Sequence, residues 1–276
     1  MTTIAAIVNE KGGVSKTSSA LSLGSAMAAR GLRVLLVDLD PQHASLTLAA
    51  GVESPKTGVA AAMQDYLTTD EAGPLAPYVT ALSPTLDLLP SGKELSNAET
   101  ALQNTEGRER ILGEVLAPAD GVYDVVLIDC PPTLGVLVTN ALTAAQTVII
   151  PVVPEYMAAA GLQGLLDTLR RIKRRKLNPH LTVSGIILAM VDNRTAHGRE
   201  VAEAVRAAFG AEVPVLGEVK RSIRVSEAAQ AGQSIVDYDP KHPVALAYRE
   251  IADELLRRWG IAAPVQAAPS VGVSNA

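Results

Sequence analysis

The sequence contains a glycine-rich segment with two lysines near its start, Asn9-Glu10-Lys11-Gly12-Gly13-Val14-Ser15-Lys16-Thr17-Ser18. The segment follows a short apolar run, Ile4–Val8, and leads into a stretch with helical character, Lys16–Arg30. Glycines let backbone N–H groups approach phosphate oxygens closely, and the N-terminus of a helix adds partial positive charge. The stretch therefore predicts a phosphate-binding loop between the first strand and the first helix.

In such a loop Lys16 would neutralise the β- and γ-phosphates of a nucleotide, and the hydroxyl of Thr17 would ligate Mg²⁺. ATP and Mg²⁺ are the expected cofactors. The expected nucleotide contacts in the loop are Lys11, Gly12, Gly13, Val14, Ser15, Lys16, Thr17 and Ser18. The standard pattern G-x-x-x-x-G-K-[ST] is not met, because Glu10 and Ser15 occupy its two glycine positions. If position 15 needs a positive φ, serine is disfavoured there, which would affect nucleotide affinity and turnover.

Two further apolar runs end in aspartate. The run Val34–Val37 is followed by Asp38, Leu39 and Asp40, and the run Val125–Ile128 is followed by Asp129. A carboxylate at the end of a buried strand beside a phosphate loop can reach Mg²⁺ directly or through water. Asp129 is therefore the predicted acid of a Walker B motif. Cys130, the only cysteine, has no histidine near it in sequence and is interpreted as a small packed residue.

The loop K-G-G-V-x-K-T-[ST] resembles the deviant Walker A motif of the ParA/MinD superfamily. The resemblance implies that Lys11 reaches across a nucleotide-sandwich homodimer to the phosphate bound by the other subunit. The segment D-x-D-P-Q resembles the Walker A′ motif of this family, in which Asp40 positions the attacking water and Asp38 supports the magnesium shell. The implied catalytic residues are Lys11, Lys16 and Asp40, and the implied magnesium-site residues are Thr17, Asp38 and Asp129.

Weaker similarities continue to about Trp259. The segment D-C-P-P-T-L-G resembles the family's D-C-P-P-S-L-G, and Leu88–Ser91 with Glu94, Leu95 and Glu99 resembles its I-P-S…L…E segment. The segment Met190–Thr195 resembles M-x-D-x-R-T, which makes Asp192 and Asn193 candidates for contacts to adenine. Simple loop polarity remains the alternative interpretation of these two residues.

Two basic segments are candidates for contact with nucleic acid. The segment Lys220–Ala228 resembles the chromosomal ParA/Soj segment P-R-N-V-R-L-S-E-A, so the resemblance implies non-specific DNA binding by Lys220, Arg221 and Arg224. In residues 170–176, six of seven positions are Lys or Arg. Phosphate contacts need positive charge but no base recognition, so both segments could bind DNA. The alternatives are a solvated basic turn for the first segment and a solvated helix end for the second.

The length of 276 residues and the apolar fraction of 48% are sufficient for one sizeable core. Apolar runs alternate with helical stretches, which predicts an α/β fold: a doubly wound, mostly parallel sheet with helices on both faces. The expected strands are 4–8, 33–37, 86–89, 124–128, 147–153, 183–190 and 213–216. The expected helices are 16–30, 105–116, 158–175, 198–209 and 243–259. We expect a single ATPase domain over residues 1–259 and a disordered tail over residues 260–276.

The leading functional hypothesis is a ParA-type DNA segregation ATPase. In this interpretation ATP drives dimerisation, the dimer binds DNA, and slow hydrolysis stimulated by a ParB-like partner releases the dimer from DNA. The expected location of the protein is the cytoplasm, in association with the nucleoid. One alternative is a related ATPase that positions another cargo on the nucleoid. A MinD-like membrane switch is a second alternative, although residues 260–276 carry no charge and do not resemble a basic amphipathic anchor, so no membrane contact is expected. An iron protein of the nitrogenase type is disfavoured by the single cysteine.

Overall fold

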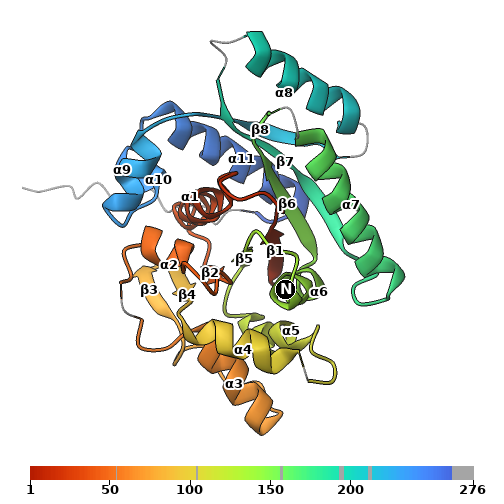
Figure 1. The fold of residues 1–276 in the computed structure, drawn as a ribbon. Helices are drawn as coiled ribbons and strands as arrows, with labels where there is room; N and C mark the ends of the chain where they lie inside the picture. The colour runs from red at the N-terminus through yellow and green to blue at the C-terminus, as the bar shows by residue number, and fades with distance from the viewer. Residues whose placement is uncertain (54, 104, 156–157, 193–195, 211–212, 263–276) are drawn as a thin grey trace, which may run out of the picture.

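One central sheet organises the protein (Figure 1). The computed structural model describes residues 1–262 apart from 54, 104, 156–157, 193–195 and 211–212, and describes no side chains at 196–199 and 201–202. In the described part of the chain, eight strands pair in the order β3-β4-β2-β5-β1-β6-β7-β8. Only the β3–β4 pair is antiparallel. The predicted doubly wound, mostly parallel α/β sheet is therefore confirmed.

The strands are β1 Thr3–Ile7, β2 Val34–Asp38, β3 Thr80–Ser83, β4 Leu86–Leu89, β5 Val125–Asp129, β6 Thr147–Val152, β7 Thr182–Val191 and β8 Val215–Lys220. Every residue of β2, β5 and β6 is buried. Continuous apolar runs of this kind are typical of strands that are covered on both faces. The edge strand β3 was not predicted, because its TALS sequence alternates between half-buried and exposed positions and lacks an apolar run.

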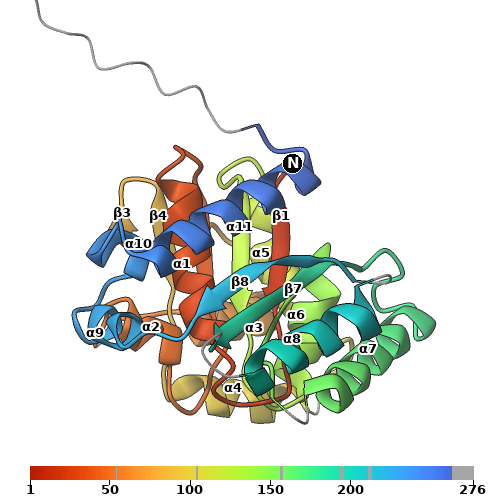
Figure 2. The same ribbon diagram turned by 90° about the horizontal axis from the view of Figure 1, so that it is seen from above.

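Helices cover both faces of the sheet (Figure 2). One face carries α1 Lys16–Ala28, α2 Ser45–Ala49, α9 Arg224–Gln230, α10 Ile235–Tyr238 and α11 Pro243–Trp259. The other carries α3 Val59–Thr69, α4 Glu94–Leu102, α5 Ile111–Leu116, α6 Val136–Ala144, α7 Ala158–Arg174 and α8 Ala196–Phe209. Each layer buries its own apolar cluster against the sheet. A short 3₁₀ turn, η1 Ala117–Ala119, follows α5.

Several predicted boundaries are corrected by the structure. The helix expected over residues 105–116 begins only at Ile111, and the strand expected over 213–216 is β8, which extends to Lys220. The short helices α2, α9 and α10 and the helices α3 and α4 were not predicted. No helix among the described residues combines the length and apolar character that crossing a membrane requires. Most of the expected tail, residues 263–276, lies outside the described residues.

A glycine allows the helix after the phosphate loop to lie close to the sheet. At Gly24 in α1, a Cβ atom would lie only 2.6 Å from Cδ2 of Leu36 in β2. The close approach keeps α1 directly over the strands whose ends form the functional site described below. Gly161 in α7 provides the opposite case, because a Cβ atom there would meet nothing within 4 Å.

We predict opposite stability effects for alanine at these two helical glycines. Alanine is favoured over glycine in a helix by about 1 kcal/mol, so Gly161→Ala should raise the free energy of unfolding by about that amount or less. Gly24→Ala should lower it by about 1–3 kcal/mol, because overpacking against Leu36 outweighs the helix preference. Urea unfolding of both variants checks this, and equal stabilisation by both would contradict the close packing of α1.

Candidate functional site

The register of the sheet brings three strand ends together at one edge. Asp129 at the end of β5 lies beside Ile7 at the end of β1 and beside Asp38 at the end of β2. The phosphate loop leaves β1 at this point and enters α1. Ligands of doubly wound sheets bind beyond the carboxyl ends of the strands, as this arrangement requires. A cavity of about 490 Å³ lies here, and its lining includes residues 12–18, Asp40, Asp129 and Met190.

The loop backbone adopts left-handed conformations at two positions. Gly13 has φ 72° and Ser15, the residue before α1, has φ 69°. The positive φ at position 15 is the condition under which serine was expected to be unfavourable, and its hydroxyl makes no capping hydrogen bond to α1. Cβ atoms at Gly12 and Gly13 would meet nothing within 4 Å, so the loop borders open space that phosphate oxygens could fill.

Asn9, which the sequence analysis did not assign to the site, fastens this loop to the neighbouring strand. Its Nδ2 donates to the carbonyl of Pro151 in β6 at 2.7 Å, and its Oδ1 accepts from the backbone N–H of Lys11 at 3.0 Å. A strand-end asparagine carries no motif of its own, so only the fold reveals this contact.

The two lysines of the loop lie in different environments. Lys16 is 7% exposed and its Nζ donates to the carbonyl of Lys11 at 3.1 Å, which leaves two of its three N–H groups for a phosphate. Burial lowers the pKa of Lys16, and the nearby Asp129, Cys130 and Asp40 oppose that shift. Lys11, by contrast, is half-exposed and forms an ion pair with Glu155, just beyond β6. Glu155 was not predicted as a partner, because the two residues are 144 positions apart.

Asp129 has the features of a cation ligand. Its Oδ2 accepts from the hydroxyl of Thr17 at 2.7 Å, whereas its Oδ1 is buried and finds no hydrogen-bond partner in the part of the chain that the structure describes. Burial, together with the charge of Asp38, raises the pKa of Asp129 to about 8. A buried carboxylate oxygen without a partner is costly unless a cation or donor fills the place. The donor set fits Mg²⁺, since Thr17 can donate to Asp129 and still offer a lone pair.

Asp38 is fully buried, and both of its carboxylate oxygens accept hydrogen bonds. It accepts from the backbone N–H of Asp40 at 2.9 Å and from the N–H and hydroxyl of Thr47 in α2 at 2.8 and 2.7 Å. Burial raises its pKa to about 6. Asp38 is not among the residues that line the cavity. Support of a magnesium shell by Asp38 stays a prediction, and in this state the residue anchors the segment that carries Asp40.

Asp40 lines the cavity and accepts three hydrogen bonds from the described residues, with Nδ1 of His43 3.7 Å from its Oδ2. Its Oδ1 accepts from the N–H groups of Gln42 and His43 at 3.0 and 3.1 Å, and its Oδ2 accepts from the hydroxyl of Ser45 at 2.7 Å. A carboxylate has about four lone-pair positions, so one remains for a water molecule. Ser91, which follows β4, holds the backbone at Asp40 in place, because its hydroxyl donates to the carbonyl of Asp40 at 2.7 Å. Cys130 is buried with a raised pKa, which agrees with a packed thiol.

The other predicted site residues lie away from the residues that line the cavity or lie outside the described residues. Asp192 follows β7 and does not line the cavity, whereas its neighbour Met190 does, and Asn193 lies outside the described residues. Lys220 and Arg221 are exposed at the end of β8. Arg224 begins α9, where it pairs with Glu227 at 2.6 Å and Asp239 at 3.3 Å and lies over the ring of Tyr238.

Known proteins with similar sequences include partitioning proteins. The AAA domain family matches residues 1–183. The chromosome partitioning protein ParA of Caulobacter vibrioides is 41% identical over 258 residues, which cover 92% of this chain and 94% of that protein. The sporulation initiation inhibitor protein Soj of Bacillus subtilis is 40% identical over 252 residues, covering 91% and 97%.

Solved structures with a similar fold include proteins that bind ADP or an ATP analog together with magnesium. The cobyrinic acid a,c-diamide synthase of Mycobacterium smegmatis, solved with a bound ATP analog and magnesium, has a TM-score of 0.80 at 36% identity, covering 94% of this chain and 96% of that one. The septum site-determining protein MinD of Pyrococcus horikoshii, complexed with Mg-ADP, has a TM-score of 0.77 at 25% identity, covering 94% and 98%.

We predict that Ser15→Gly stabilises the nucleotide-free protein. A left-handed residue other than glycine costs about 1–2 kcal/mol, and the larger conformational entropy of glycine in the unfolded chain offsets part of the gain. The free energy of unfolding should therefore rise by about 0.5–1 kcal/mol in urea denaturation. Ser15→Ala is the matched control, because it removes the hydroxyl and keeps the strained φ. If alanine stabilised as much as glycine, the strain would not lie in the backbone.

We also predict that Asp129→Asn stabilises the nucleotide-free protein near pH 8. Folding raises the pKa of this acid from 3.8 to about 8, so the folded state binds the proton more tightly and loses stability as the pH rises through this window. Asparagine keeps an acceptor for Thr17 and removes the buried charge, a gain of about 1–3 kcal/mol. Thermal unfolding at pH 5 and pH 8 measures it. A variant that is less stable than the parent at pH 8 would contradict the assignment.

Proposed function

The chain belongs to the ParA/MinD family of P-loop ATPases, and from that premise we propose that it is a DNA segregation ATPase whose nucleotide state controls a DNA-binding dimer. In this proposal ATP and Mg²⁺ bind in the cavity beyond β1, β2 and β5, and the products are ADP and phosphate. The observation that carries the proposal is the convergence of Lys16, Thr17, Asp40 and Asp129 on that one cavity. The 40–41% identity to chromosome partitioning ParA and to Soj supports the cargo.

Each group in the cavity has a proposed role. The ammonium of Lys16 and the backbone of the loop bind the phosphates, while Thr17 and Asp129 hold Mg²⁺, which neutralises charge on the phosphates. Asp40 orients the attacking water through its remaining acceptor position. Phosphoryl transfer depends mainly on positioning and electrostatics, so a carboxylate held by three donors suits this task.

Lys11 is the proposed link between nucleotide binding and dimerisation. In the single chain it pairs with Glu155, and both side chains are 51% exposed. An ion pair at such an exposed position is worth less than about 1 kcal/mol, so a phosphate on a second subunit can compete for the lysine. We propose that Lys11 leaves Glu155 when two ATP-bound subunits meet. The dimer then persists until hydrolysis, which a ParB-like partner accelerates.

The proposed DNA contacts differ in how readily they reach a phosphate. Lys220 and Arg221 are exposed at the carboxyl edge of the sheet. Arg224 is partly neutralised by Glu227 and Asp239, so it must exchange these partners to bind DNA directly. The basic segment 170–176 ends α7, and α7 runs back toward the start of β7 at the opposite edge. We therefore place the DNA contacts at the end of β8 and interpret the α7 cluster as a solvated helix end.

We predict ATP-dependent, salt-sensitive binding to duplex DNA of arbitrary sequence. The double variant Lys220→Gln and Arg221→Gln should reduce the log–log salt slope by about two, because each neutralised phosphate contributes about 0.9. Fluorescence anisotropy with ATP, with ADP and without nucleotide across a salt series measures this. Lys16→Ala should abolish the ATP dependence.

The matched control is Arg257→Gln together with Arg258→Gln, which removes two positive charges from the far end of α11. Equal losses in the control and the β8 variant would point to net charge alone. Intact ATP binding with no nucleotide-dependent DNA binding would overturn the proposal.

A further inference from the structure

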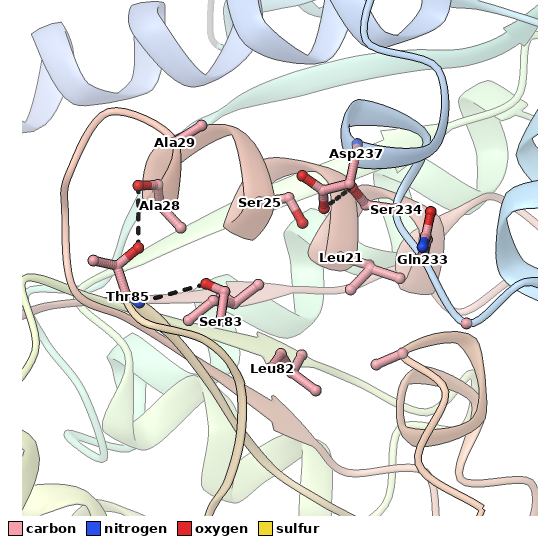
Figure 3. Close-up of a pocket in the computed structure, with 13 residues that line it drawn as sticks. Leu21, Ser25, Ala28, Ala29, Leu82, Ser83, Thr85, Gln233, Ser234 and Asp237 are labelled. Carbon is pink, nitrogen blue, oxygen red and sulfur yellow. Dashed lines mark hydrogen bonds between the residues drawn. The ribbon is translucent and has the colours of Figure 1, made fainter. Parts of the chain in front are cut away.

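A second cavity, of about 350 Å³, lies on the face of the sheet that α1 covers (Figure 3). Its walls come from the second half of α1, the β3–β4 hairpin, the end of α2 and residues 232–237. None of the described residues lines both this cavity and the nucleotide cavity. We call it the α1–α10 cavity.

The polar side chains of the α1–α10 cavity are the carboxylate of Asp237, the carboxamide of Gln233 and several hydroxyls. Ser25 is 4% exposed, and its Oγ has no hydrogen-bond partner among the described residues. Asp237 accepts from the hydroxyl of Ser234 at 2.7 Å and is an exposed residue of the lining. No Lys, Arg or His belongs to the described residues that line it. A negative site with no cation excludes phosphates and carboxylates as ligands.

The remaining walls are apolar. Leu21 from α1 faces Leu82 from the hairpin, with Leu86 and three alanines completing the lining. Buried hydroxyls without partners are costly, and a ligand that supplies a donor or acceptor removes that cost. An apolar slot with an anionic end and an unpaired hydroxyl is complementary to an alkyl chain with an amino group.

We propose that the α1–α10 cavity binds a small alkylammonium ligand. The ammonium group donates to the carboxylate of Asp237, the alkyl chain packs between Leu21 and Leu82, and a second polar group pairs with Oγ of Ser25. A free diamine and the lysine side chain of another protein share this chemistry. The diamine alone offers a second amino group to Ser25.

The α1–α10 cavity is connected to the nucleotide site through shared helices and a backbone contact. The helix α1 begins at Lys16, and Ala50, at the end of α2, lines the cavity. Beside it, Gly51 and Gly232 touch through their backbones, so that a Cβ atom on Gly232 would lie 2.7 Å from Cα of Gly51. This contact joins the end of α2 to the end of α9. A bound ligand therefore restrains two segments that carry proposed ATP and DNA contacts, a regulatory role that rests on the proposed function.

The binding test uses the nucleotide-free full chain and is independent of ATP hydrolysis. Putrescine should bind saturably in isothermal titration calorimetry, whereas butanediol and succinate of the same chain length should not. Asp237→Asn keeps an acceptor for Ser234 and should weaken putrescine binding at least tenfold. Ser25→Ala should weaken it severalfold. Asp70→Asn, which removes an exposed carboxylate at the end of α3, is the matched control and should leave binding unchanged.

The outcomes separate the possibilities. Absence of saturable amine binding, or putrescine binding that Asp237→Asn does not change, would overturn the site, and equal binding of butanediol would overturn the ammonium assignment. Tighter binding of N-acetyl-lysine amide than of putrescine, lost in Asp237→Asn, would support the site and identify a protein lysine as the source. Saturating putrescine should also change the ATPase rate of the parent but not of Asp237→Asn. Binding without any change in rate would overturn the regulatory role alone.

Discussion

The alignment of β1, β5 and β2 at their carboxyl ends is the constraint on which the site depends. It sets Asp129 between Ile7 and Asp38 and brings two buried carboxylates side by side. A slip of one residue would turn these side chains to the other face of the sheet, so the apolar runs that fix the register also fix the site. The two acids are then distinguished by their hydrogen bonds. Asp38 accepts three and is a structural anchor, whereas Asp129 accepts one and, as far as the described residues reach, keeps its second oxygen unpaired.

That difference gives the nucleotide site its capacity to respond to a ligand. An unpaired, buried oxygen on Asp129 and a left-handed Ser15 both cost stability in the absence of a ligand. A bound cation and phosphate remove part of this cost, so the ligand-bound arrangement is favoured by differential interaction, as a population shift requires. The segment after β2 is linked to the bound ligand, because Asp38 and Asp40 accept hydrogen bonds from its backbone and from the first turn of α2.

The fold class and the phosphate loop could be predicted from the sequence because their signals are local. Apolar runs ending in Asp38 and Asp129, and glycines between a strand and a helix, act over fewer than ten residues. The condition under which serine is disfavoured at position 15, a positive φ, is met by its φ of 69°, and the effect on nucleotide affinity and turnover stays a prediction. The contacts of Asn9 with Pro151 and of Lys11 with Glu155 join segments more than 140 residues apart and follow no motif. Short elements such as α2, with five residues, carry too little periodicity to be recognised.

The placement of positive charge explains why one basic segment suits a switch and the other does not. The protein carries a formal net charge of −5, so in the proposed function a basic segment attracts DNA locally rather than through the whole molecule. Lys220 and Arg221 lie at the same sheet edge as the nucleotide cavity, and the turn that follows α9 touches the turn that follows α2 through Gly232 and Gly51. A movement of α2 can therefore reach these charges through direct contacts. The cluster at the end of α7 lies at the opposite edge, on the exposed end of a helix of 17 residues.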